Sequence, residues 1–279
     1  MLISEAFDLY KNDYMVFKCQ SIRIVESHDY VKRTLIQTIG DKDITYLSLS
    51  DISAWQKEML KTRIQNTVRN LLTRIRMVLK YLELRDMPCL KSALIPTPKH
   101  IDTVPAFLTA KEVEAMIQNA HSLRNKFVIS LLYSSGIRLS EFLQLNRGQI
   151  CEQRFTVVGK GGKARLCFID NRTEQLMKQY LSKREDNCAA LVISHLHHER
   201  MTATNVQLLV KNSARRAGIQ KKVTPHTLRH SFATNFLQNN GNLRYCQEML
   251  GHASIETTMK YSHITNTDLE KQYNKFHTT

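Results

Sequence analysis

A proline-bearing stretch near the middle of the chain limits the folds open to it, because it separates two helical parts. Three of the five prolines fall between residues 91 and 107: Pro96, Pro98 and Pro105. Proline fixes φ, lacks a backbone donor and disfavours helix in the residue before it, so an extended linker is expected here. A chain of 279 residues is also long for one core. We therefore predict a domain at 1–92, a linker at 93–106 and a second domain at 107–279.

The first domain is expected to be a bundle of helices, and its clearest helix runs from about Lys61 to Leu84. Apolar residues recur on one face of this helix: Ile64, Val68, Leu71, Ile75, Val78 and Leu82. A separate stripe is polar or basic: Arg69, Thr73, Arg76 and Lys80. The apolar face would pack in the bundle and the basic stripe would contact phosphates; a solvated charged face is the alternative.

The second domain is expected to be mostly helical, with one β-hairpin. Thr109 and Glu112 have the spacing of a capping box that opens a helix. Two β-rich runs, 155–158 and 164–169, flank the turn Gly-Lys-Gly-Gly-Lys at 159–163. The turn lacks the pattern of a nucleotide-binding phosphate loop. The predicted fold class is mainly α: a helical bundle, then a mixed, mostly helical domain with a small antiparallel hairpin.

Thr224 and Pro225 are a helix-start signal, with Thr224 as the N-cap and Pro225 in the first position. His226 and Arg229 then share one face of the first turn. A helix N-terminus favours an anion and disfavours imidazolium, so a phosphate and a neutral His226 can coexist there. The alternatives are a capped helix with an incidental histidine, or zinc binding by His226 and His230, for which the His-Glu-x-x-His motif is absent.

A second arginine lies in a tight turn far upstream. Gly136 can end the preceding helix in a left-handed conformation, which places Arg138 just before a helix that starts near Ser140. Glu141 is spaced to support the guanidinium group of Arg138 or of Arg229. A surface salt bridge is the simpler alternative.

Three further residues complete the set: Lys160 at the hairpin tip, His252 after Leu250-Gly251, and Tyr261 near the C-terminus. The order arginine, hairpin lysine, His-x-x-Arg, Gly-His and tyrosine resembles that of the tyrosine recombinase (phage integrase) family. The resemblance covers about residues 106–265. It is weaker over residues 1–90, which are similar to the family's helical, SAM-like core-binding domain.

The resemblance implies a role for each matching residue. Arg138 and Arg229 would hold the scissile phosphate and stabilise the charge of the transition state. Tyr261 would attack phosphorus, and because a free phenol has a pKa of about 10 it needs a proton acceptor, which His226 would supply. Lys160 would protonate the departing 5′ oxygen.

The remaining roles follow from the same resemblance. His252 would donate a hydrogen bond to the phosphate, and Glu141 would support the arginines. Lys163 and Arg165 would contact the DNA backbone. No cofactor and no metal ion are expected.

The last helix is expected to begin after Thr267 and to carry an apolar stripe of Leu269, Tyr273 and Phe276. In the family such a helix is exchanged between subunits of a tetramer on DNA, so the resemblance implies a homotetramer. Docking of this stripe on its own domain is the alternative.

The formal net charge of +15 is spread along the chain and favours a polyanionic partner, here double-stranded DNA. The N-terminus has no secretory pattern, and no apolar run is long enough to span a membrane. The six cysteines are scattered without a Cys-x-x-Cys pair, which is typical of reduced thiols. We expect a cytoplasmic protein.

The leading hypothesis is a metal- and ATP-independent site-specific DNA recombinase of the simple two-domain kind, as in the Xer, Cre and transposon-resolvase branches. It would act through a 3′-phosphotyrosine and a Holliday junction. A type IB topoisomerase-like nicking and closing enzyme and a non-cleaving DNA-binding accessory protein are the alternatives. The target site and any need for accessory proteins stay open.

Overall fold

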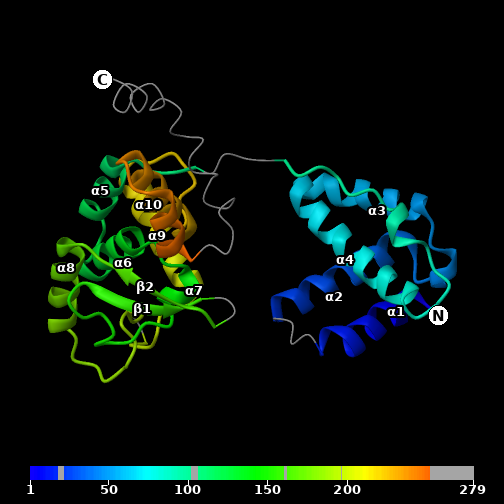
Figure 1. Ribbon diagram of the computed structural model, residues 1–279, viewed down its shortest axis with the longest axis horizontal. Coiled ribbons are helices and arrows are strands. Elements are labelled where there is room, and N and C mark those ends of the chain that lie inside the picture. Colours follow the sequence, from blue (N-terminus) through cyan, green and yellow to red (C-terminus); the bar gives the residue numbers. More distant parts are fainter. Residues whose placement is uncertain (18–21, 102–105, 160–161, 196, 252–279) are drawn as a thin grey trace, which may run out of the picture. The chain divides into compact units, whose positions relative to one another are not determined.

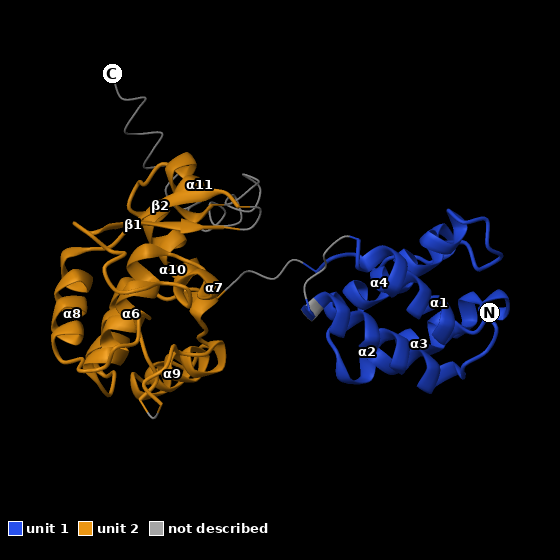
Figure 2. Cartoon of the chain, turned by 90° about the horizontal axis from the view of Figure 1, so that it is seen from below, with its two compact units in different colours: residues 1–103 blue, residues 104–279 orange. Residues whose placement is uncertain are grey.

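The computed structural model describes residues 1–17, 22–101, 106–159, 162–195 and 197–251. The chain divides into two compact units, residues 1–103 (unit 1) and residues 104–279 (unit 2), which are coloured separately in Figure 2. Each unit has its own hydrophobic core.

The regular secondary structure in the described part of unit 1 consists of helices (Figure 1). Its elements are α1 (Ile3–Tyr10), a π-helix (Lys11–Met15), α2 (Ile22–Ile39), a 3-10 helix (Ile44–Tyr46), α3 (Leu49–Thr62), α4 (Gln65–Glu83) and a second 3-10 helix (Ser92–Leu94). Helix α2 packs against α1, α3 and α4. Trp55 of α3 is fully buried in this core, and its indole N–H donates to Thr34 Oγ1 at 3.0 Å.

The helix expected from Lys61 to Leu84 is interrupted, so this prediction was wrong at its start. Arg63 and Ile64 are extended, with ψ of 146° and 152°, and they separate α3 from α4. Ile64 is 74% exposed and does not belong to the core. A single straight helix could not turn back on itself, so the break is what lets α3 pack against α4. The other apolar positions are buried as predicted: Val68, Leu71, Ile75, Val78 and Leu82.

The chain after the last 3-10 helix of unit 1 lies along α4. Asn66 Nδ2 donates to Ile101 O at 2.8 Å, and Ile101 N donates back to Asn66 Oδ1 at 3.0 Å. Two basic side chains of α4 also contact this segment: Arg69 Nε donates to Pro98 O at 3.1 Å, and Arg76 donates to Thr97 Oγ1. The proline-bearing stretch is therefore attached to unit 1 as far as residue 101.

Helix α6 lies among the other helices of unit 2 (Figure 1). Its residues from Phe127 to Leu132 are all buried. The elements of unit 2 are α5 (Ala110–Gln118), α6 (Leu123–Ser135), α7 (Leu139–Phe142), β1 (Arg154–Val158), β2 (Ala164–Phe168), α8 (Asn171–Ser182), α9 (Ala203–Arg216), α10 (Pro225–Gln238) and α11 (Leu243–Leu250). Helix α6 contacts α5, α8, α10 and β2. The capping box predicted at Thr109 is present, and Thr224 is the N-cap of α10 as predicted, with Pro225 in the first helical position.

Strands β1 and β2 form the predicted antiparallel hairpin, in the register Arg154 opposite Phe168 and Val158 opposite Ala164. Gly159 N donates to Lys163 O at 2.9 Å and closes the turn. Helix α11 lies beside β2 (Figure 2). The predicted fold class, mainly helical with a small antiparallel sheet, is confirmed.

Two properties relevant to the environment of the protein are visible in the described residues. No helix there combines the length and apolar character that a bilayer crossing requires. The described cysteines are all free thiols: Cys89, Cys151, Cys167, Cys188 and Cys246.

Candidate active site

Three arginines from separate segments converge on the C-terminal end of α11. Each of the last backbone carbonyls there accepts from one guanidinium group: Met249 O from Arg165 Nε at 2.8 Å, Leu250 O from Arg229 Nη2 at 2.6 Å, and Gly251 O from Arg138 Nη2 at 2.9 Å. We call these three carbonyls the carbonyl row. The last carbonyls of a helix lack intrahelical partners and carry partial negative charge, so cations are stabilised there.

Arg138 is the N-cap of α7, in the turn where the sequence placed it. Its backbone N–H donates to Glu141 Oε2 at 2.7 Å, and its Nη1 donates to Glu141 Oε1 at 2.9 Å. The Arg138 side chain is 36% exposed, whereas that of Glu141 is 5% exposed. The nearly buried Glu141 thus binds the inner side of Arg138, and the other side of the Arg138 guanidinium group stays at the surface.

Arg165 makes a bidentate ion pair with the same carboxylate. Its Nη1 and Nη2 donate to Glu141 Oε1 at 2.7 Å and to Oε2 at 2.6 Å. Burial alone would raise the pKa of Glu141. The hydrogen bonds from Arg165 and from the Arg138 backbone outweigh that effect and lower the pKa to about 2. Glu141 is therefore ionised at any physiological pH.

Arg229, on the first turns of α10, is 2% exposed. Besides Leu250 O, it donates through Nη1 to Gly136 O at 2.5 Å. Gly136 caps α6 in the left-handed conformation that the sequence predicted, with φ of 59°. A single buried guanidinium group thereby joins the ends of α6 and α11.

His226, one turn before Arg229, lies exposed at the N-terminus of α10. Partial loss of hydration and the positive charges of Arg229 and Arg138 lower its pKa below the usual value. Its ring lies 4.2 Å from that of His230, centroid to centroid, at 69°. In the described part of the chain no three His, Cys, Asp or Glu side chains are grouped as a metal-ligand set.

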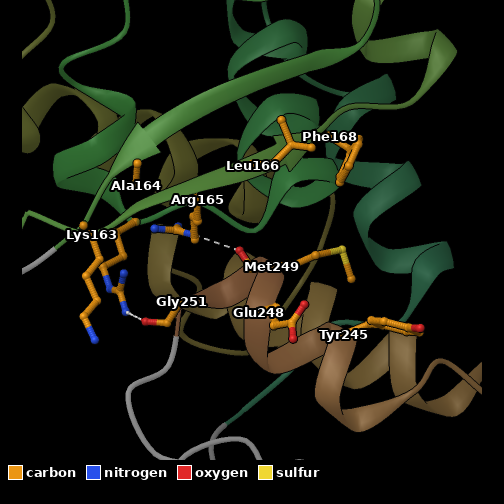
Figure 3. Close-up of a pocket in the computed structure, with 11 residues that line it drawn as sticks. Lys163, Ala164, Arg165, Leu166, Phe168, Tyr245, Glu248, Met249 and Gly251 are labelled. Atoms are coloured by element: carbon orange, nitrogen blue, oxygen red, sulfur yellow. Dashed lines mark hydrogen bonds between the residues drawn. The ribbon is translucent and has the colours of Figure 1, made fainter.

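A cavity of about 930 Å³ opens between β2 and α11, beside the carbonyl row. Figure 3 shows Arg165 reaching from β2 to Met249, with Lys163 near Gly251 and Tyr245 and Glu248 on α11. Arg138 and the exposed Lys163 both line the cavity. The cavity therefore presents cationic groups to whatever enters it.

Four of the residues predicted from the sequence are thus brought into one place: Arg138, Glu141, His226 and Arg229. Three others, Lys160, His252 and Tyr261, lie outside the described residues, as do Leu269, Tyr273 and Phe276 of the expected last helix. The basic stripe on α4 belongs to unit 1: Arg69, Thr73, Arg76 and Lys80.

Arg165 has a different environment from the one expected of a DNA-contacting side chain. Its side chain is 10% exposed, and its donors point to Glu141 and Met249. The apolar pattern of β2 did not reveal this, because Leu166 and Phe168 are each 48% exposed while Arg165 and the buried Cys167 face inward. The carbonyl row could not be predicted from the sequence either, because every residue has a backbone carbonyl and no residue type marks these three.

Residues 106–268 match the model of the phage integrase family, which is more than half of the chain. The chain belongs to the phage integrase family. The family resemblance read from the sequence, that of the tyrosine recombinases, is thereby confirmed.

Curated relatives carry the names of tyrosine recombinases. The chain is 36% identical over 196 residues to tyrosine recombinase XerD of Oceanobacillus iheyensis, an alignment that covers 66% of each protein. It is 31% identical over 254 residues to tyrosine recombinase XerC of Natranaerobius thermophilus, with 84% of this chain and 83% of the relative covered.

The fold is also found among solved structures. The integrase of transposon Tn1549, solved in complex with transposon right-end DNA, superposes with a TM-score of 0.81 over 100% of both chains at 16% identity. At this identity the likeness shows a common fold.

Proposed function

We propose that this family member is a site-specific DNA recombinase that breaks and rejoins duplex DNA through a 3′-phosphotyrosine. The observation that carries the proposal is the gathering of Arg138 and Arg229 at the end of α11, with His226 of α10 close enough to feel both charges. From Gly251 the chain continues directly to His252 and then to Tyr261. The names of the XerD and XerC relatives support the same activity.

The two arginines suit a phosphodiester that gains charge in its transition state. A guanidinium group carries five N–H donors, so it can hold a backbone carbonyl and a phosphate oxygen at once. Arg138 would receive the phosphate at its exposed side. Arg229 would bind the phosphate from the buried side of the site, with its orientation fixed by the carbonyls of Gly136 and Leu250. Loss of one such preorganised donor typically costs about 10²–10³ in rate.

His226 would accept the proton of the attacking phenol. Its lowered pKa keeps the imidazole neutral at physiological pH, as a base must be. The Tyr261 oxygen would bond to phosphorus while the bond from phosphorus to the 5′ oxygen breaks, and Lys160 would give that oxygen a proton. His252 would donate a hydrogen bond to the phosphate. The products are a 3′-phosphotyrosine and a free 5′ hydroxyl.

Rejoining would reverse these steps with the hydroxyl of a partner duplex. The first exchange gives a Holliday junction, and a second round resolves it. Because the phosphodiester bond is replaced by a phosphotyrosine ester rather than hydrolysed, neither ATP nor a metal ion is expected to be needed.

Double-stranded DNA is the proposed partner of both units, with residues 1–92 as the core-binding domain and residues 107–279 as the catalytic domain. Lys163 at the cavity and the exposed Thr73 and Lys80 on α4 would contact the DNA backbone. Arg69 and Arg76 would do so while they also hold the segment that follows unit 1's last helix. A tetramer joined through Leu269, Tyr273 and Phe276 is part of the same proposal.

The first test is covalent capture of DNA by the purified chain. Nicked duplexes with a randomised centre are incubated with protein in EDTA without ATP, and adducts that survive denaturing detergent are recovered and sequenced. The nick lets the cleaved fragment diffuse away, so the strand cannot be rejoined and the adduct accumulates. Wild-type protein should form adducts mainly on one core sequence, which is then enriched among the recovered duplexes. Tyr261→Phe should form no adduct yet bind the enriched duplex with little change in Kd. An adduct formed by Tyr261→Phe would show that another residue is the nucleophile.

The captured sequence then separates the related activities. Two copies of the site on one plasmid should give recombinant joints with wild-type protein. Relaxation of supercoils without joints would indicate a nicking and closing enzyme instead, and specific binding without any adduct would indicate a non-cleaving accessory protein.

A further inference from the structure

We propose that Arg165 is a positioning residue of this site: it fixes Arg138 and the end of α11 through Glu141 and Met249 and does not itself contact DNA. The inference rests on the proposed function, because it assigns Arg165 a part in the same reaction. It replaces the DNA contact expected from the sequence.

Arg165 forms the structural link between two parts of the site. Through Nη1 and Nη2 it clamps both oxygens of Glu141, the carboxylate that also binds Arg138. Through Nε it holds Met249 O, the first carbonyl of the row. Its side chain is 10% exposed, and Figure 3 shows it turned toward α11. All three nitrogens of its guanidinium group are therefore used inside the protein.

Arg165 also lies close to Gly251 and Gly159, the residues that precede the proposed catalytic groups His252 and Lys160. A Cβ at Gly251 would lie 2.9 Å from Arg165 Cδ, and one at Gly159 would lie 3.6 Å from Arg165 Nη1. His252 follows Gly251, and Lys160 follows Gly159. A displaced Arg165 side chain would consequently disturb the points from which both proposed catalytic groups extend.

The geometry requires arginine rather than lysine. Only a planar guanidinium fork can pair with two carboxylate oxygens and still direct Nε to a third acceptor. Without Arg165, the nearly buried Glu141 would keep only Arg138 as its cationic partner, and the Arg138 guanidinium group would be drawn toward it. Misplacement of a catalytic group by about 1 Å can cost about 10²-fold in rate.

The test compares Arg165→Gln, Arg165→Lys and the double variant Glu141→Gln/Arg165→Gln with wild type. Arg154→Gln is the matched control, because Arg154 is on the same hairpin, is 59% exposed and pairs only at the surface with Glu152. Single-turnover adduct formation on saturating nicked site, Kd for that site, Tm, and hydrogen exchange of the peptide 245–251 are measured.

Arg165→Gln should slow adduct formation about 10²-fold with Kd nearly unchanged, and should speed exchange at the end of α11. Arg165→Lys should restore little of the rate, because it cannot form the fork. The double variant removes the uncompensated carboxylate, so its Tm should recover while its rate stays low. Arg154→Gln should match wild type in every measurement.

Loss of Glu141's main partner should also raise the pKa of Glu141 in Arg165→Gln, so that its protonation adds to that of His226 on the acidic limb of the rate profile. Glu141 would then protonate, and release Arg138, at a higher pH than in wild type. The double variant should lack this shift, since it has no carboxylate there to titrate. A role in stability alone would not produce this difference.

Three results would overturn the inference. Wild-type rate in Arg165→Gln would exclude positioning, and weaker binding with an unchanged rate at saturation would make Arg165 a DNA contact. Unchanged hydrogen exchange at residues 245–251 in Arg165→Gln would show that Arg165 does not fix the end of α11, and this result does not depend on whether the protein cleaves DNA. If wild type itself forms no adduct, the proposed function fails, and the exchange result still decides where Arg165 acts.

Discussion

At the scale of single residues, the site combines a buried carboxylate, a buried arginine and a histidine whose charge is suppressed. His226 lies near two guanidinium groups, Arg229 and Arg138, whose positive charges add to the loss of hydration in lowering its pKa. A neutral imidazole beside two cations can accept a proton without first losing one of its own. The same two guanidinium groups would attract the phosphate. Arg138 and Arg229 therefore both bind the substrate and set the base strength of His226.

This environment gives a prediction for the titration of His226. Its midpoint, followed by NMR in the DNA-free protein, should lie below the value of about 6.5 for an ordinary histidine. Arg138→Gln removes one of the charges that lower the pKa, so the midpoint should rise. The His226→Asn variant identifies the resonance by its absence. A midpoint at or above the ordinary value would remove the physical reason for choosing His226 as the base.

At the scale of elements, helix ends and extended segments are held by side chains from elsewhere. The end of α11 is one case, and the segment that follows unit 1's second 3-10 helix is another. Asn66 binds both backbone groups of Ile101 as a neighbouring strand would, with donor–acceptor distances of 2.8 and 3.0 Å. Helix α4 thus has an inner face in the core and an outer face that carries the start of the connection between units.

Asn66→Ala should release this segment while leaving the bundle folded. Two hydrogen bonds are lost at a partly exposed site, so the free energy of unfolding of unit 1 should fall by about 1–2 kcal/mol. The amide of Ile101 should exchange much faster, as measured by NMR. Asn70→Ala, an exposed position on the same helix, is the control and should leave the Ile101 amide unchanged. Equal exchange in both variants would mean that Asn66 does not hold the segment.

At the scale of the whole molecule, the two cores are built from separate stretches of chain. The core of unit 1 uses buried residues from Ile3 to Ile95, and the main core of unit 2 uses those from Leu108 to Leu228. The single tryptophan, Trp55, lies fully buried in the first of them. Its fluorescence therefore reports unfolding of unit 1, whereas circular dichroism reports both units.

Gly136→Ala should separate the two transitions. A non-glycine residue at φ of 59° costs about 1–2 kcal/mol, and the added Cβ would lie 2.5 Å from Phe232. In urea the circular-dichroism transition of unit 2 should move to a lower concentration, while the Trp55 fluorescence midpoint stays in place. Gly148→Ala is matched in φ, at 76°, but has nothing within 4 Å, so it should shift unit 2 less. A parallel shift of both signals would show that the units unfold together.

Sequence reasoning succeeded where the cause is local. The N-caps at Thr109 and Thr224, the left-handed Gly136 and the hairpin around residues 159–163 follow from turn and capping chemistry within a few residues. The order of the motif residues was enough to identify the family. These features need no knowledge of distant segments, because backbone preferences and short-range hydrogen bonds determine them.

Only the tertiary structure decided what distant segments do to one another. In the folded chain the helix is interrupted at Arg63 and Ile64, which allows α3 and α4 to pack together. In β2, Arg165 faces inward while Leu166 and Phe168 are exposed. The tertiary structure also brought Arg138, Arg165 and Arg229 to consecutive carbonyls at the end of α11. Such contacts depend on the packing of whole elements and on backbone atoms that every residue shares, and a linear pattern of side chains records neither.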